Sequence, residues 1–164
     1  MADLTQLEEL HLSDTKLTGA GMKTLAKLKR LRWLYLNGTR ITDESFVHLA
    51  GLSNLERLEI ADLGRSEDGD EEKMISGDGL KHLTGLKRLS YLYLYNTDID
   101  DDHVRHFAKM RGLRDLFLGV QDFGDGGLAH LKNLTQLEML EGGVTRQQER
   151  ELKKALPDLF IYNP

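Results

Sequence analysis

The clearest hydrophobic pattern in the chain is strict alternation, seen best in the run YLYLYNT, Tyr91 to Thr97. Leu92 and Leu94 alternate there with three of the protein's five tyrosines. Successive side chains of a β-strand point to opposite faces, so the run predicts a short strand with one leucine face and one tyrosine face. The leucines are expected in a core, and the surroundings of the tyrosines have to be inferred from the rest of the chain.

The same pattern recurs along almost the whole sequence. Segments with matching apolar positions start at residues 4, 28, 52, 86, 110 and 134, which are 24 residues apart except for the step of 34 from 52 to 86. Each unit follows LxxLxxLxLxxTxIxDxGLxxLxx. The two strand columns are Leu10, Leu34, Leu58, Leu92, Leu116 and Leu140, and Leu12, Leu36, Ile60, Leu94 and Leu118. A unit of this size cannot bury its apolar side chains alone, so we expect the units to stack.

These columns resemble a leucine-rich repeat of the 24-residue kind found in many bacterial proteins, close to GALA-type repeats. The turn column holds threonine (Thr15, Thr39 and Thr97) where such repeats usually have asparagine. The xLxL segment predicts one strand per unit, and spacings such as Val104 to Phe107 predict a short helix. We therefore expect an α/β fold, an open leucine-rich-repeat solenoid. It should form a short horseshoe arc with a parallel sheet on the concave face and short helices on the convex face.

We expect residues 1–164 to form a single domain of these six repeats, with an insertion at about 64–73 and a C-terminal cap at about 156–164. Pro157 should stop the last helix, and Leu159 to Tyr162 should add a final strand. No amphipathic cap precedes the repeat that begins at Leu4. That edge is either tolerated as exposed, paired with another copy, or continued in a further domain.

The residues between the strand leucines should point over the concave face. Six of the eleven aromatic residues (five Tyr, five Phe and one Trp) fall in these outward columns: Trp33, Tyr35, Tyr91, Tyr93, Tyr95 and Phe117. One interpretation is β-propensity and cross-strand packing alone. The other is a binding surface, because Tyr and Trp are enriched at interface hot spots. Arg57 and Glu59, with Glu9, His11 and Asp115, would then form a polar rim.

These observations favour a non-catalytic protein–protein interaction module that binds a protein or peptide partner on its concave face. The expected contacts are Trp33, Tyr35, Arg57, Glu59, Tyr91, Tyr93, Tyr95 and Phe117. One alternative is a structural or assembly element that self-associates end to end through the uncapped N-terminal edge. Another, implied by the resemblance alone, is the substrate-recognition arm of a larger ligase or effector.

The insertion reads GRSEDGDEEK, Gly64 to Lys73, with five acidic and two basic side chains. High charge without apolar anchors predicts a mobile loop. It is either a solvated insertion or a segment that overhangs the aromatic residues and contacts a basic ligand. It does not match a calcium-binding loop, because the required glycine and distal glutamate are missing.

Composition narrows the remaining possibilities. The net charge of −5 gives no sign of the basic face that nucleic-acid binding requires. No apolar run reaches transmembrane length, so no membrane association is expected. There is no cysteine, and MADLTQLEEL lacks the features of a signal peptide, so a cytoplasmic location is expected.

Catalytic and cofactor chemistry is not expected. The sequence contains no nucleophile elbow, phosphate-binding loop, dinucleotide fingerprint or zincin motif. One column of four histidines (His48, His82, His106 and His130) suggests a metal set at first sight. Helices of neighbouring repeats pack about 10 Å apart, whereas zinc needs its imidazoles at about 2 Å. Repetition therefore explains the column, and we expect no metal, no other cofactor and no enzyme activity.

Overall fold

Seven parallel strands form a single sheet and follow one another in chain order. The computed structural model describes residues 4–61, 75–122 and 124–163. The strands are β1 (Glu9–His11), β2 (Trp33–Tyr35), β3 (Arg57–Ile60), β4 (Tyr91–Leu94), β5 (Asp115–Asp122), β6 (Met139–Gly143) and β7 (Phe160–Tyr162). β1 and β7 are the two edges, so the sheet does not close.

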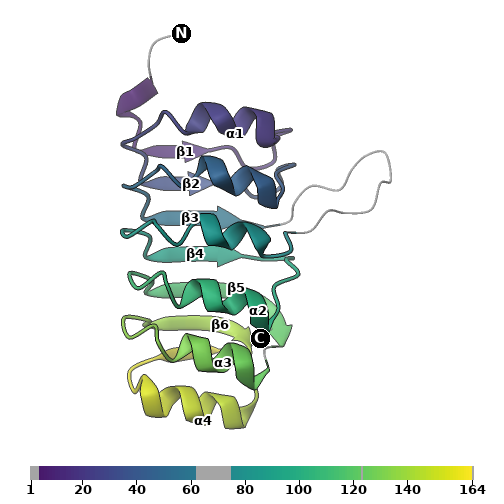
Figure 1. Cartoon of the computed structure of the whole chain (residues 1–164), viewed down its shortest axis with the longest axis vertical. Coiled ribbons are helices and arrows are strands. Elements are labelled where there is room, and N and C mark those ends of the chain that lie inside the picture. Colours follow the sequence, from purple (N-terminus) through teal and green to yellow (C-terminus); the bar gives the residue numbers. More distant parts are fainter. Residues whose placement is uncertain (1–3, 62–74, 123, 164) are drawn as a thin grey trace, which may run out of the picture.

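Short helices form a second layer on one side of the sheet, in front of the strands in Figure 1. They are α1 (Gly19–Leu25), α2 (Asp101–Phe107), α3 (Asp125–Leu131), α4 (Arg146–Ala155) and the 3-10 helices η2 (Asp43–His48) and η3 (Asp78–His82). A further 3-10 helix, η1 (Leu4–Gln6), precedes β1 at the N-terminal end of the sheet. From α1 to α4, each helix packs against the next along the chain. The predicted open α/β solenoid with a parallel sheet is confirmed. We call the sheet surface that faces away from the helices the open face.

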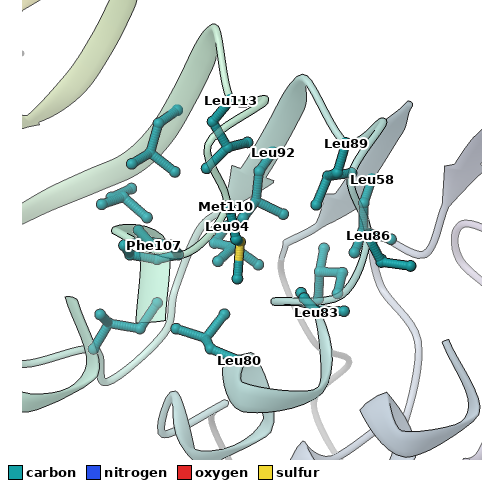
Figure 2. Close-up of a cluster of buried hydrophobic side chains, with 14 of the residues drawn as sticks. Leu58, Leu80, Leu83, Leu86, Leu89, Leu92, Leu94, Phe107, Met110 and Leu113 are labelled. Atoms are coloured by element: carbon teal, nitrogen blue, oxygen red, sulfur yellow. The ribbon is translucent and has the colours of Figure 1, made fainter. Parts of the chain in front are cut away.

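The core lies between the two layers and runs through the stack. Leu58, Leu92 and Leu94 from the strands meet Leu80 of η3 and Phe107 of α2, as Figure 2 shows. All five side chains are fully buried. The leucines predicted to face a core therefore do so, and burial of apolar surface between repeats is the main source of stability.

The turn column has a structural reason for threonine. The Thr39 hydroxyl is buried and donates a hydrogen bond of 2.6 Å to the carbonyl of Leu36, the residue that follows β2. The residue before each turn threonine adopts a left-handed conformation, with φ of 57° at Asp14, 64° at Gly38 and 54° at Asn96. Glycine, asparagine and aspartate tolerate this region best, so sequence and turn geometry agree.

The fifth and sixth repeats depart from the predicted pattern. β5 is eight residues long instead of three or four. Gly119 takes the left-handed conformation there with φ of 68°, and the pairing with β6 shifts between Phe117 and Asp122. Beyond the shift Asp122 pairs with Gly143, so β6 continues through the Glu141-Gly142-Gly143 segment in which the sequence shows no turn.

Aspartates at the first residue of a helix tie one repeat to the next. The two carboxylate oxygens of Asp43 accept hydrogen bonds from the amides of Ser76 (2.9 Å) and Gly79 (2.7 Å). Asp101 accepts one from the amide of Gly124 (2.8 Å) in the same way. The Asp43 link joins residues on either side of the predicted insertion, whose residues 64–73 lie outside the described part of the chain. These hydrogen bonds therefore connect η2 to the η3 region, although the third and fourth repeats start 34 residues apart and not 24.

The Asp43 link can be tested by unfolding. We expect Asp43→Ala to lower the free energy of unfolding by about 1–3 kcal/mol, because two partly buried backbone amides lose their acceptor. Asp102→Ala is the matched control, since Asp102 is an exposed aspartate in the first turn of α2. Urea denaturation measures both variants. Equal stability of the two variants would show that the link does not stabilise the stack.

Candidate functional site

Strand register places the predicted contact residues of the strands on the open face in two parallel rows. The first row is Glu9, Trp33, Arg57, Tyr91, Asp115, Met139 and Phe160. The second row is His11, Tyr35, Glu59, Tyr93, Phe117, Glu141 and Tyr162. Tyr95 follows β4 on the same side of the chain. The sequence-based outward columns for these two rows therefore match the pairing of the strands.

Four of the aromatic rings form one contiguous group over β4 and β5. The Phe117 ring centroid lies 5.0 Å from that of Tyr91 and 5.9 Å from that of Tyr93. Tyr95 stacks on Tyr93 at 4.5 Å, and it covers Gly119, where a Cβ atom would lie 3.4 Å from the ring. All four aromatic side chains are half-buried. The tyrosines thus shield one another and remain partly exposed to solvent.

Arg57 lies in the middle of the aromatic residues and not at their rim, as the sequence had suggested. Its guanidinium carbon is 3.6 Å from the Tyr91 ring centroid and 5.8 Å from that of Tyr35. It donates to Glu59, with an ion-pair distance of 2.6 Å. The prediction failed because the guanidinium of a residue on β3 reaches aromatic rings on both neighbouring strands, β2 and β4. This cation–π and ion-pair cluster holds its rings in fixed positions.

The pKa shifts in this cluster keep Arg57 charged and Tyr91 neutral. Burial lowers the pKa of Arg57, but the hydrogen bond to Glu59 and the neighbouring charges outweigh it, and the net shift is upward. Burial raises the pKa of Tyr91, although Arg57 partly opposes the shift. The Tyr91 hydroxyl therefore stays protonated at neutral pH and can donate a hydrogen bond.

The N-terminal end of the open face carries two further ring contacts. His11 stacks on Tyr35 with ring centroids 4.1 Å apart and planes inclined by 7°. Its Nε2 lies 2.7 Å from a carboxylate oxygen of Glu9. The Arg32 guanidinium lies 5.0 Å from the Trp33 ring centroid. The Trp33 ring is half-buried beside Arg32, so part of it remains accessible on the open face.

A row of charges borders the open face at the residues that precede β1, β2, β3, β5 and β6. Arg32 pairs with Glu8 at 3.3 Å on one side and Glu56 at 2.9 Å on the other. Arg114 pairs with Glu138 farther along the stack. The hydrogen bond to Glu56 is the main cause of the raised pKa of Arg32. These exposed pairs align neighbouring strands, although each contributes little free energy.

Sequence reasoning missed the C-terminal part of the open face. Phe160 and Tyr162 of β7 are 58% and 51% exposed and extend the two rows by one strand. The sequence pattern assigns them to a cap, yet the alternation of Phe160, Ile161 and Tyr162 is the signal that could have found them. Glu141 of β6 falls in an outward column but is not among the predicted contacts.

Glu141 is a buried carboxylate. It is 8% exposed, and burial raises its pKa above the ordinary value. None of the residues that the structure describes forms a hydrogen bond or an ion pair with it. Asp115 in the first row is partly buried and has a raised pKa for the same reason, with a further contribution from Glu138. Arg57 and Arg114 partly oppose the pKa shift at Asp115, so it is at Glu141 that the open face carries a negative charge that no described residue neutralises.

The helical side shows a different chemistry. In the described part of the chain, no group of three or more His, Cys, Asp or Glu side chains could hold a metal ion. Burial lowers the pKa of His106, one of the repeated histidines, so that its ring favours the neutral form. Asp100 accepts a hydrogen bond from the amide of His103 and caps α2. Within the ranges described, every helix is too short or too polar to cross a bilayer.

Two surface hollows on this side are lined largely by charged residues. One of about 580 Å³ follows α4 and is bordered by Arg146, Glu149, Arg150, Lys153 and Lys154. The other, about 570 Å³, lies among the loops after η3 and α2. Both are wide open to solvent. Their charged linings are typical of the solvated outer surface that a terminal repeat and its neighbours need.

Comparison with known proteins agrees with this architecture. Residues 5–62, from the start of η1 to just beyond β3, match the family model described as leucine rich repeat. In fold, 108 chains of solved structures match. A leucine-rich repeat protein of Leptospira interrogans is 21% identical with a TM-score of 0.63, over 97% of this chain and 38% of that one. Internalin C2 of Listeria monocytogenes is 22% identical with a TM-score of 0.61, over 99% of this chain and 74% of that one.

The chain has the leucine-rich repeat fold, and its first repeats match the leucine rich repeat family model. At these identities the solved structures show the fold and not the ligand. This chain spans 38% of the length of the Leptospira protein. No curated protein matches the sequence.

Because the carboxylate of Glu141 is buried without a partner among the described residues, we expect its replacement by a neutral side chain to stabilise the protein at neutral pH. The folded-state pKa of Glu141 is raised, so the carboxyl favours folding below its ordinary pKa and opposes it as the pH rises through the folded-state pKa. We therefore expect Glu141→Gln to raise the melting temperature at pH 7 by about 2–4 °C, the shift that corresponds to about 1 kcal/mol. The gain should disappear below about pH 4, where the unfolded carboxyl is also protonated.

Calorimetry at pH 7 and pH 4 measures this difference. Glu138→Gln is the matched control, because it removes the same charge from an exposed carboxylate paired with Arg114. We expect it to leave stability unchanged or slightly lower. A melting temperature of Glu141→Gln below that of the unsubstituted protein at pH 7 would contradict the assignment of Glu141 as an unpaired buried charge.

Proposed function

We propose that the protein is a non-catalytic interaction module that binds a protein or peptide partner on its open face. Leucine-rich repeat arrays generally serve as protein-interaction modules with extended binding surfaces. The observation that carries the proposal is the concentration of six aromatic side chains on one face of the sheet, around the Arg57–Glu59 pair. The proposed contacts are Trp33, Tyr35, Arg57, Glu59, Tyr91, Tyr93, Tyr95 and Phe117.

The physical chemistry of this surface suits protein recognition. Tyrosine and tryptophan offer a large rigid area together with a polar group, which is why they dominate interface hot spots. The rings of Tyr91, Tyr93 and Phe117 are already held by one another and by Arg57. A partner therefore has little side-chain entropy to remove when it docks.

The size of the surface indicates a short segment or one element of a folded partner. Neighbouring strands lie about 4.8 Å apart, so β2 to β5 span about 14 Å. An extended peptide rises about 3.3 Å per residue, so four or five residues laid across the strands would cover the proposed contacts. Additional residues would reach β1 on one side or β7 on the other.

Selection from a random peptide library tests the proposal and requires no identified partner. We expect peptides selected on the protein to bind Tyr91→Ala/Tyr93→Ala at least about 10-fold more weakly, a loss of about 1.4 kcal/mol. Fluorescence polarisation measures the affinities. Val47→Ala, which truncates an exposed side chain of η2 on the helical side, should bind as tightly as the unsubstituted protein.

Both tyrosines are half-buried, so the folded state of the double variant must be checked by thermal unfolding. Tyr91→Leu/Tyr93→Leu keeps apolar volume in the same positions and serves as the second variant. Undiminished binding of the selected peptides by a folded double variant would overturn the proposal, as would failure to select any peptide that distinguishes the two proteins.

One structural feature favours a second candidate, end-to-end self-association. At the β1 edge Leu7, Leu10, Leu12 and Leu17 are only partly buried, whereas their equivalents in the second repeat are fully buried. Leu4 is 63% exposed beside them. In this alternative the N-terminal edge docks on another copy, and light scattering would show a mass that increases with concentration. A constant monomer mass would count against it.

The role of a recognition arm within a larger enzyme rests on family resemblance alone, and a cytoplasmic location and bacterial source remain predictions from the sequence.

A further inference from the structure

The carboxylate of Glu141 lies on the open face between aromatic residues of the neighbouring strands, and no described cation pairs with it. Glu141 pairs in register with Phe117 on one side and Tyr162 on the other. Because Leu140 is fully buried in the core, alternation directs the Glu141 side chain to the open face. It is nonetheless only 8% exposed, and no described residue forms a hydrogen bond or an ion pair with it.

The same face shows what a completed arrangement looks like. Glu59 occupies the same row two strands before Phe117, and it binds the Arg57 guanidinium at 2.6 Å. That guanidinium lies 3.6 Å from the Tyr91 ring centroid. Carboxylate, guanidinium and aromatic ring thus form one cluster at β3 and β4.

At β6 the carboxylate and the rings recur without the cation. Met139 occupies the row position that Arg57 occupies on β3, so this position of β6 offers no guanidinium to Glu141. Phe117 and Tyr162 provide aromatic surfaces on both neighbouring strands, and Tyr162 is 51% exposed. Asp115, in the first row of β5, adds negative charge close by.

We propose that Glu141, Phe117 and Tyr162 form a subsite for a basic side chain, an arginine, presented by the protein or peptide partner. The inference rests on the proposed function and specifies the partner's chemistry. A planar guanidinium can donate two hydrogen bonds to a carboxylate and stack on an aromatic ring at the same time, which an ammonium group does less well.

Energetics favours this occupant over others. A buried carboxylate without a partner is costly, and a ligand cation recovers part of that cost on binding. Aromatic rings add cation–π attraction, which is stronger where water is excluded. A metal ion is a poor alternative, because hard cations take six or more oxygen ligands and the described residues provide no such group here.

N-acetyl-arginine amide and N-acetyl-citrulline amide are the probes that test the subsite. Citrulline has nearly the same shape but carries a neutral urea in place of the guanidinium. We expect the arginine probe to cause saturable NMR shifts at the amides of Phe117, Glu141 and Tyr162 at millimolar concentration. Binding of the citrulline probe should be at least about fivefold weaker, because it cannot form the charged pair.

Two variants of the full chain complete the experiment. Glu141→Gln should bind the arginine probe at least about fivefold more weakly than the unsubstituted protein. Glu9→Gln removes one negative charge from the distant β1 end of the same face and should bind it unchanged, which separates a local pair from an effect of net charge. Equal binding of the two probes, equal binding by Glu141→Gln, or no saturable shift at these amides would each overturn the inference.

Failure of this inference is distinguishable from failure of the proposed function. Library-selected peptides that require Tyr91 and Tyr93 but contain no basic residue would remove the arginine subsite and leave the interaction module intact. Selected peptides that carry an arginine would support both proposals if replacing that arginine with citrulline weakens their binding to the unsubstituted protein. The same replacement should not weaken their binding to Glu141→Gln. The double-mutant comparison of Glu141→Gln with the citrulline peptide gives that coupling directly.

Discussion

Leucines stacked from strand to strand fix the register of the sheet, and the surface chemistry depends on that register. Leu34, Leu58, Leu92 and Leu116 stand opposite one another in consecutive strands and are fully buried. A slip of one residue would move leucines to solvent and aromatic rings into the core, so the hydrophobic effect strongly disfavours it. The two outward rows follow as a geometric consequence. Aromatic and charged residues that lie far apart in the sequence thereby become neighbours.

The irregular third repeat shows how robust this register is. β3 and β4 pair over four residues although 34 positions separate the paired residues Arg57 and Tyr91, whereas 24 positions separate Glu9 from Trp33 and Tyr91 from Asp115. Hydrogen bonds from Ser76 and Gly79 to Asp43 hold the helical layer together at the same place. The Arg57–Tyr91 cation–π contact spans this junction at 3.6 Å. The centre of the open face is therefore built across the longest gap in the repeat pattern.

Much of this arrangement could be predicted from the sequence, because leucine recurrence encodes both strand position and side-chain direction. The position of Arg57 among the rings could not, since a guanidinium can reach several neighbours and its contacts depend on the side chains of adjacent strands. The burial of Glu141 was equally hidden, because Glu141 and Glu59 look alike in the repeat. They differ in that Glu59 has Arg57 two residues before it whereas Glu141 has Met139, and in that Glu141 pairs with β7, which lies outside the repeat pattern. The extra length of β5 depends on a left-handed Gly119 that no column predicts.

We expect a bound partner to lie on the open face, and neither on the helical side nor at the β1 edge. Mapping the NMR shifts of a bound library-selected peptide over the whole chain tests it most directly. We expect the perturbed residues to follow the two rows from β2 to β6, with the largest changes at the rings of Tyr91, Tyr93 and Phe117. Perturbations centred on α1 to α4, or on Leu4, Leu7 and Leu10 at the N-terminal edge, would contradict it.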